Sequence, residues 1–371
     1  MLDAHGAQLP LRLAGEPAAR PGTRVLLAQT AQSRFVFEDV PSPPVPSLLR
    51  GFSAPVRLAG LSGQQLSFLA THDSDPFVRW DAGQRYATNA LLAMAQSWRP
   101  GEAPALDRGV ITAAAATLAG AEADPAFAAA ALTLPSEAYL ADQQEIVDPD
   151  AIHAVREAAR RALGRALHDE LRTAYDALAD SGPYRVNGAA IGRRALRNAC
   201  LAYLVAAGQP DSLRLAKAQF DHGANMTDVL AALAALSNVD CPQRAEALAE
   251  FHARWRGDAL VLDKWFAIQA TSTLPETPQT VRDLAAHPDF DLRNPNRVRA
   301  LTGSFSVGNP VRFHAVSGEG YDFLADIILA LDPLNPQVAA RLVAPLGQWR
   351  RMDTARQAKM RAALQRIFAA P

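Results

Sequence analysis

The sequence predicts a mainly α-helical protein, in which a superhelical array of helix pairs follows a small β-rich segment. From about residue 62 onward, apolar residues recur at spacings of three and four, which is the period of an amphipathic helix. Short polar breaks divide this part into helix pairs of roughly 30–45 residues, the length typical of helical repeats. Residues before this point form short alternating runs between Gly, Pro and Ser, as strands and turns do. We therefore predict two domains, residues 1–61 and residues 62–371.

Composition excludes several classes of function. The 371 residues carry a net charge of −1, so no overall field attracts nucleic acid or an anionic membrane. No run approaches the roughly 18 apolar residues of a membrane span, and the first residues lack the features of a secretory signal. Cys200 and Cys241 fit no metal-binding spacing and indicate a reducing compartment. We expect a soluble, cytoplasmic protein.

Within residues 1–61 we predict four short strands, each an apolar or alternating run. A proline-rich stretch at residues 41–46 interrupts any ladder there, because proline donates no backbone N–H. The predicted strands are residues 11–13, 24–28, 34–38 and 54–59.

The helices are predicted from the same apolar period and from N-capping residues before it. Asn225 followed by Asp228 is typical of a capping arrangement. We predict helices over residues 64–71, 77–98, 104–121, 125–133, 151–178, 188–207, 212–220, 225–236, 241–255, 259–271, 278–287, 322–331 and 350–368.

The stretch from residue 294 to residue 342 carries the most distinctive pattern, because three Asn-Pro pairs follow one another at residues 294, 309 and 335. Asn accepts from unpaired N–H groups and Pro fixes φ for the first turn, so each pair predicts a helix start. Arg297, Arg299 and Arg341 lie at or near these starts. Guanidinium groups and helix N-termini together favour a carboxylate or another anion. The alternative is that these arginines cap carbonyls and pair with acidic side chains.

Other candidate sites have a simpler structural interpretation. None of the eight histidines belongs to H-E-x-x-H, so we expect no metal ligand in this chain. His153 and Glu157 share a helical face and are interpreted as a surface pair. Cys200, Trp265 and Phe266 lie in apolar settings and are predicted to be core.

The last helix is basic, and it lacks the aromatic residues and wider basic surround of a nucleic-acid site. We interpret its cations as a solvated face. They are Arg350, Arg351, Arg356, Lys359, Arg361 and Arg366.

An ordered set of motifs resembles the C-terminal part of bacterial aminopeptidase N, a family of gluzincin zinc aminopeptidases. Residues 294–301 read N-P-N-R-V-R-A-L, residues 303–305 read G-S-F, and residues 335–342 read N-P-Q-V-A-A-R-L. Earlier motifs follow in the family's order: F-S-A-P-V-R-L at 52–58, R-W-D-A at 79–82, N-M-T-D at 225–228 and D-K-W-F at 263–266. The resemblance spans nearly the whole chain.

The resemblance implies that residues 1–61 are the later strands of a linking β-sandwich. It also implies that the helical part is a HEAT-like array that caps the active-site cavity. It implies that Arg299 and Arg341, and less clearly Arg297, face the cavity and bind a short peptide by its carboxylate or backbone. The zinc ion and the catalytic groups would belong to an N-terminal catalytic domain, so this chain alone should bind no zinc and be inactive. An autonomous helical-repeat module that binds a protein or peptide is the alternative.

Overall fold

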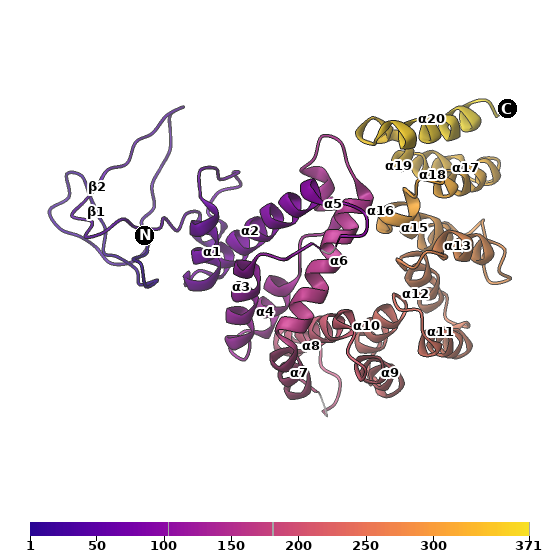
Figure 1. Ribbon diagram of the computed structural model, residues 1–371, viewed down its shortest axis with the longest axis horizontal. Coiled ribbons are helices and arrows are strands. Elements are labelled where there is room, and N and C mark those ends of the chain that lie inside the picture. Colours follow the sequence, from indigo (N-terminus) through magenta and orange to yellow (C-terminus); the bar gives the residue numbers. More distant parts are fainter. Residues whose placement is uncertain (103, 180–181, 371) are drawn as a thin grey trace.

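The computed structural model describes residues 1–102, 104–179 and 182–370, and helices make up most of it. Figure 1 shows them following one another around a curved array, with residues 1–61 extending from one end. The predicted fold class, a helical array after a small β-rich segment, is confirmed. Pro371, the last residue of the predicted second domain, lies outside the described residues.

The first half of the array contains the helices up to residue 236. They are α1 (Gly63–His72), α2 (Pro76–Ser97), α3 (Arg108–Ala119), α4 (Pro125–Leu132), α5 (Glu137–Asp142), α6 (Pro149–Ala166), α7 (His168–Ala177), α8 (Gly188–Ala207), α9 (Ser212–His222) and α10 (Met226–Leu236).

The second half completes the curve, and its later helices are shorter. They are α11 (Pro242–Trp255), α12 (Ala259–Ala270), α13 (Thr277–Ala285), α14 (Pro295–Val298), the π-helix η2 (Arg299–Gly303), α15 (Ser304–Gly308), α16 (Pro310–Phe313), α17 (Glu319–Leu331), α18 (Pro336–Leu342), α19 (Ala344–Gly347), the 3₁₀ turn η3 (Trp349–Arg351) and α20 (Thr354–Phe368).

Side-chain caps fix many of the helix starts. A helix begins at all three Asn-Pro pairs, as predicted, and two of the three asparagines cap it through the side chain. Asn294 accepts from the backbone N–H groups of residues 296 and 297, and Asn335 accepts from Val338. Asn309 makes no such cap. Its buried amide instead donates to the carbonyls of Ala270 and Ser272, at 3.0 and 2.7 Å. This asparagine therefore joins α16 to the end of α12.

Two helix predictions need correction. The helix predicted over residues 151–178 is two helices, because Leu167 takes φ −118° and ψ 26°, outside the helical range. The second correction is α5, which the apolar period does not predict. This helix has six residues, too few to show a period, and Ser136 caps it by accepting from Tyr139.

The N-terminal segment contains less sheet than predicted. β1 (Arg12–Leu13) and β2 (Phe37–Glu38) form a two-stranded antiparallel sheet with Arg12 opposite Glu38. Isolated bridges also join Leu2 to Gln8 and Val45, and Leu11 to Arg20. The strands predicted over residues 24–28 and 54–59 are wrong, because those residues take no strand conformation. Val25 is 85% exposed and Leu27 is 69% exposed, so these apolar runs have no neighbour to pair with.

A small core attaches this segment to the helices. Leu2 is fully buried against Leu66, Leu69 and Val78 of α1 and α2. Burying a leucine side chain stabilises by about 1.5–3 kcal/mol. The segment is therefore anchored at its first turn while much of its remainder is exposed.

The helices approach closely where small residues allow it. A Cβ on Gly164 of α6 would lie 2.3 Å from the carbonyl oxygen of Tyr203 on α8. Only glycine permits this crossing, because any side chain would collide with the backbone of α8. One continuous core follows, from Leu91 of α2 to Ala363 of α20.

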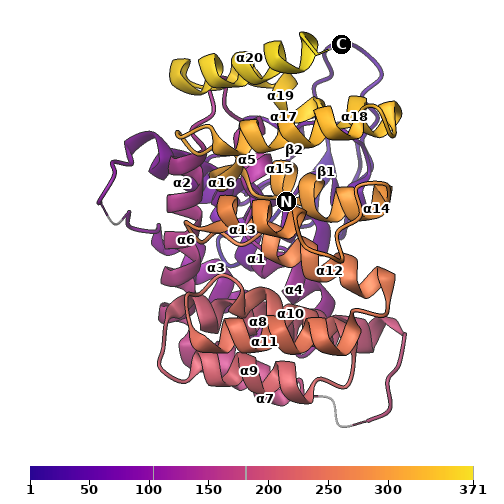
Figure 2. The same cartoon turned by 90° about the vertical axis from the view of Figure 1, so that its right-hand side faces the viewer.

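The end of the array returns to α6, and this contact joins parts of the chain far apart in sequence. Figure 1 shows α20 to the upper right of α5 and the start of α6, and Figure 2, turned by 90°, shows α20 above α5. Arg356 of α20 donates to Asp150 of α6 at 2.5 Å, to Asp353 at 2.6 Å, and to the carbonyl of His314 at 2.6 Å. Arg351 donates to the carbonyl of Ala141 at 2.7 Å. We call this the closure contact.

The interpretation of the basic last helix as a solvated face is wrong for Arg356, which the closure contact buries. It holds for the exposed cations Arg350, Lys359, Arg361 and Arg366. Arg356 is 6% exposed. Burial alone would lower the pKa of Arg356, but Asp353 and Asp150 raise it above its usual value, so the buried guanidinium stays charged. A charge this deep needs its partners, since an unpaired buried ion is strongly destabilising.

We predict that Arg356→Met lowers the free energy of unfolding by about 2–3 kcal/mol, because it removes charge-assisted hydrogen bonds and leaves two carboxylates unpaired. Urea unfolding monitored by circular dichroism measures it. Arg214→Met, at an exposed position of α9, is the matched control and should change stability by about 0.5 kcal/mol at most. Equal effects of the two substitutions would contradict the closure contact.

Candidate functional site

A cavity of about 380 Å³ lies at the closure contact, and we call it the closure pocket. Its walls come from two parts of the array that lie far apart in sequence: α5 and α6 on one side, and the segment from η2 to η3 on the other. Most of the lining is apolar. The groups that can act on a ligand are Glu137, His314, Arg341, Gln348 and Arg351.

Arg341 is the predicted site residue that lies in this pocket. It belongs to the last turn of α18, a helix that begins where Asn335 caps Val338. Its side chain is exposed. Among the residues that the structure describes, no hydrogen bond or ion pair engages its guanidinium group. A free guanidinium beside an apolar cavity can bind a carboxylate with both of its N–H edges.

Arg299 is close to the pocket in sequence but does not line it. It begins the π-helix η2, whose last residue, Gly303, is part of the pocket wall. Its Nη1 donates to Asn296 Oδ1 at 3.1 Å, and the side chain is exposed. π-helical turns are rare and occur often at functional sites. The structure therefore brings one predicted arginine to the pocket and leaves the other beside it.

Arg297 is buried in a different environment. Its Nε lies 2.8 Å from Asp263 Oδ1, and its guanidinium stacks 4.9 Å from the centre of the Phe266 ring. It also donates to the carbonyl of Asp289 at 3.2 Å. These contacts match the alternative in which the arginines of this stretch pair with acids and cap carbonyls, and they leave Arg297 little capacity for a ligand.

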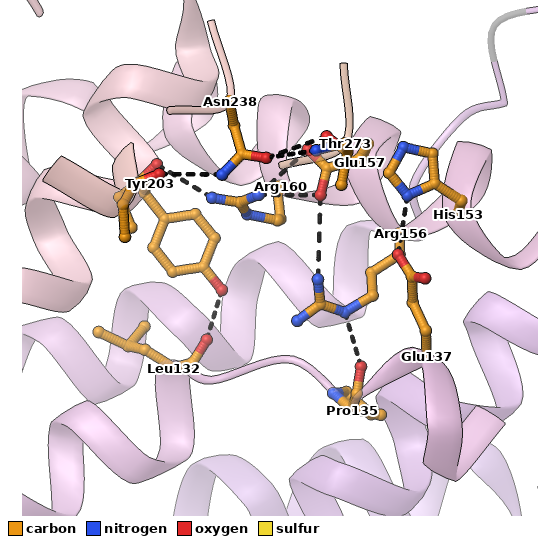
Figure 3. Close-up of polar contacts among 12 residues, drawn as sticks. Leu132, Pro135, Glu137, His153, Arg156, Glu157, Arg160, Tyr203, Asn238 and Thr273 are labelled. Atoms are coloured by element: carbon orange, nitrogen blue, oxygen red, sulfur yellow. Dashed lines mark hydrogen bonds and ion pairs between the residues drawn. The ribbon is translucent and has the colours of Figure 1, made fainter. Parts of the chain in front are cut away.

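A row of charged side chains follows α6 away from the pocket, and Figure 3 shows their contacts. His153 lies with Nδ1 2.8 Å from Glu137 Oε1, so it pairs across to α5 instead of with Glu157 as predicted. Arg156 donates to the carbonyl of Pro135 at 2.9 Å, and Arg160 donates to Glu157 at 2.8 Å. This row ties α6 to the segment between α4 and α5.

Glu157 is ionised although it is largely buried. Burial alone would raise the pKa of its carboxyl, but Arg160, His153 and Arg156 lower it below the usual value. The arrangement is one carboxylate among cations, and each cation is also held by a carbonyl or a second acid. It has the chemistry of a structural ion network.

Comparison with known proteins follows from this architecture. Residues 63–371 match a family described as a domain of unknown function with ARM repeats, DUF3458_C, and residues 1–60 match one described as having an Ig-like fold, DUF3458. The first match covers most of the chain. The chain belongs to the DUF3458_C family.

Relatives of this DUF3458_C chain include aminopeptidase N of Escherichia coli, which is 42% identical over 99% of the chain and 42% of its own length. Aminopeptidase N of Caulobacter vibrioides is 42% identical over 97% of the chain and 41% of its own length. The chain thus spans about two-fifths of the length of these relatives, and the part it matches is their C-terminal part.

Among solved structures, a crystal structure of Legionella pneumophila aminopeptidase A in complex with aspartic acid is similar over all of this chain and 43% of the other. The TM-score is 0.82 and the sequence identity 29%. The similarity therefore includes both the helical array and residues 1–61.

The residues of this DUF3458_C chain do not fit the zinc site of a gluzincin. Two histidines one helical turn apart with a glutamate between them are required, and the sequence has no such motif. Asp169 and Glu170 follow His168, but no second histidine lies at the required offset. No catalytic step is therefore derived through zinc for these residues.

Sequence reasoning missed the polar groups that build the pocket floor. His314 and Arg351 line the pocket, and Arg356 holds the backbone of His314 from behind. No spacing rule connects them with α6, because 206 positions separate Asp150 from Arg356. The only local signal was Asp353 three residues before Arg356, which is typical of a capped helix start.

The closure should weaken in acid. Burial, and then the charge of Arg356, lower the pKa of His314 from 6.5 to about 4. Between these values the unfolded chain binds a proton that the folded chain does not, so stability falls as the pH drops from about 6.5 to about 4. The shift corresponds to roughly 3 kcal/mol.

We therefore predict that His314→Gln reduces the loss of unfolding free energy across this pH range, measured by urea unfolding at several pH values. Carboxylates also titrate in acid and contribute to the pH dependence in both proteins. The difference between the unfolding free energies of variant and parent therefore reports the contribution of His314. His168→Gln, on α7, is the matched control. Parallel curves for the His314 variant and the parent protein would contradict the assignment.

Proposed function

We propose that this chain is the capping region of a zinc-dependent aminopeptidase that removes N-terminal residues from short peptides. In this proposal the helical array covers the active-site cavity of an N-terminal catalytic domain, limits access to it and orients the substrate. The zinc ion, which would activate water for peptide hydrolysis, belongs to that catalytic domain. The chain on its own is not expected to hydrolyse peptides or to bind that zinc ion.

The observation that carries the proposal is the similarity to aminopeptidase N over 97–99% of this chain. A similarity confined to a few repeats would fit any helical array. One that includes residues 1–61 as well supports the same arrangement of parts. The two free thiols support a cytoplasmic location, because a reducing compartment keeps cysteines unpaired.

We further propose that residues 1–61 and 62–371 act as separate domains. The first would be the later strands of a β-sandwich that joins the cap to the catalytic domain. Exposed apolar side chains support this, because Val25, Leu27 and Val56 lack the neighbours that a sandwich supplies. Leu2 and the buried pair of Arg50 with Asp73, 3.6 Å apart, would fix the sandwich to α1 and α2.

Arg341 is the proposed substrate contact, and Arg299 a second one beside it. A free guanidinium at the closure pocket would bind the C-terminal carboxylate of a short peptide, while the catalytic domain acts at the other end. Arg297 is buried against Asp263, and this position favours a structural role for that residue instead of a substrate contact. An autonomous helical-repeat module is the alternative, and it predicts no effect of Arg341 on peptide hydrolysis.

We predict that Arg341→Ala, made in the complete aminopeptidase that contains this chain, raises KM for a tripeptide by roughly tenfold or more. A charge-assisted hydrogen bond contributes about 1.5–3 kcal/mol, which sets that factor. The kcat should change little, because the contact is equally strong before and during reaction. The same tripeptide with a C-terminal amide should show no change in KM, since it has no carboxylate.

Arg350→Ala is the matched control, because Arg350 stacks on Trp349 at 4.4 Å and does not line the pocket. It should leave both substrates unaffected. Arg299→Ala tests the second contact in the same assay. Equal changes for the acid and amide peptides, or no change for either Arg341 or Arg299, would contradict the proposed carboxylate contact.

A further inference from the structure

Two histidines and an aspartate converge at the junction of α11 with the segment after α13. His252 lies on α11, and His287 and Asp289 follow the end of α13. Nε2 of His252 lies 2.6 Å from Asp289 Oδ2, and Nδ1 of His287 lies 3.8 Å from the same oxygen. The three ligand atoms lie within 4.8 Å of one another. In the described part of the chain, no other group of three such side chains is this close.

The donor set is that of a transition-metal site. Imidazole nitrogens and a carboxylate oxygen bind zinc at about 2.0–2.2 Å, which separates the ligand atoms of one ion by roughly 3 Å. The observed separations of 2.6 and 3.8 Å fall on either side of this value. Small side-chain rotations are therefore enough to place all three atoms around one ion.

The surroundings hold the ligands in place. The ring of Trp265 packs 4.6 Å from His252 and 5.4 Å from His287, and its own N–H donates to the carbonyl of Leu248 at 2.9 Å. Arg297 donates to the carbonyl of Asp289 at 3.2 Å. A buried tryptophan behind the rings and a fixed backbone at the carboxylate are the support that ligand residues need.

One side of the cluster is open to solvent. The side chains of His252, His287 and Asp289 are 21%, 30% and 35% exposed. An ion can therefore enter from water and keep water molecules in its remaining positions. Metal binding would replace the hydrogen bond between His252 and Asp289, and that from the N–H of Asp289 to His287 Nδ1, now 3.1 Å long.

We propose that His252, His287 and Asp289 bind a divalent first-row transition-metal ion, with zinc the best fit because it has no strong preference for one geometry. This site is separate from the catalytic zinc of the proposed function and does not depend on it. The ion would join α11 to the segment after α13. The sequence predicted no metal ligand in this chain because H-E-x-x-H is missing. With this site, that prediction would be right only for ligands of the H-E-x-x-H type.

The test is titration of the metal-free chain with Zn²⁺ by calorimetry and with Co²⁺ by visible absorption. We expect one ion per chain, and a rise in melting temperature on binding, because an ion that binds only the folded state stabilises it. Asp289→Asn and His287→Ala should each weaken binding by at least roughly 100-fold, since each removes a direct ligand. Asp289→Asn changes the side chain least and can still form hydrogen bonds. It is therefore the variant of the two that is expected to stay folded.

His168→Ala is the matched control, because His168 also lies beside an aspartate, with Nδ1 3.1 Å from Asp169 Oδ1, but without a second histidine. It should bind the ion as the parent chain does. Failure of the parent chain to bind either ion, or undiminished binding by Asp289→Asn and His287→Ala, would overturn the proposal. None of these outcomes depends on peptidase activity.

Discussion

The contact on which the architecture depends is the ion cluster of Arg356 with Asp150 and Asp353. In a stack of helical repeats each unit touches only its neighbours. Contacts between neighbours therefore do not fix the distance between units far apart in the stack. Arg356 supplies that constraint, because it joins α20 to the start of α6 across 206 positions of sequence. The cost of burying its guanidinium is offset by two carboxylates and by the carbonyl of His314.

The closure pocket is a consequence of this contact. Its walls come from α5 and α6 on one side and from η2 to η3 on the other, so its shape depends on the contact between α6 and the C-terminal end of the array. Arg341 reaches the pocket because α18 packs on α17, which packs on α20. The proposed substrate contact of Arg341 therefore depends on the closure contact. Acid weakens the closure contact through His314, and with it the substrate contact.

Local chemistry was predictable from the sequence, and distant pairing was not. The helix over residues 188–207 follows from its apolar period, and the caps at Asn225 and Asn335 follow from residue type. Asn309 and Arg356 have the same local patterns as a cap and a solvated cation, yet both are buried against distant segments. The strands predicted over residues 24–28 and 54–59 failed because a strand needs a partner, and sequence alternation does not supply one.

The candidate site also contains residues that the sequence predicted and residues that it did not. Arg341 was predictable because its motif resembles one in a known family, whereas His314 and Arg351 enter the pocket only through the closure. The cluster of His252 with Asp289 was hidden for a related reason, since 37 positions separate its members. In every case the sequence shows the chemistry of each side chain, but it does not show which side chains lie close together.

The most direct measurement of the central claim is the distance between spin labels on the two sides of the closure, at Glu145 and Ala355. Both positions are exposed, Cys241 would be replaced by serine, and buried Cys200, whose thiol pKa is raised to about 12, would not react. The account predicts one short, narrow distance distribution that becomes broad and long with Arg356→Met. A broad, long distribution in the parent chain would contradict it.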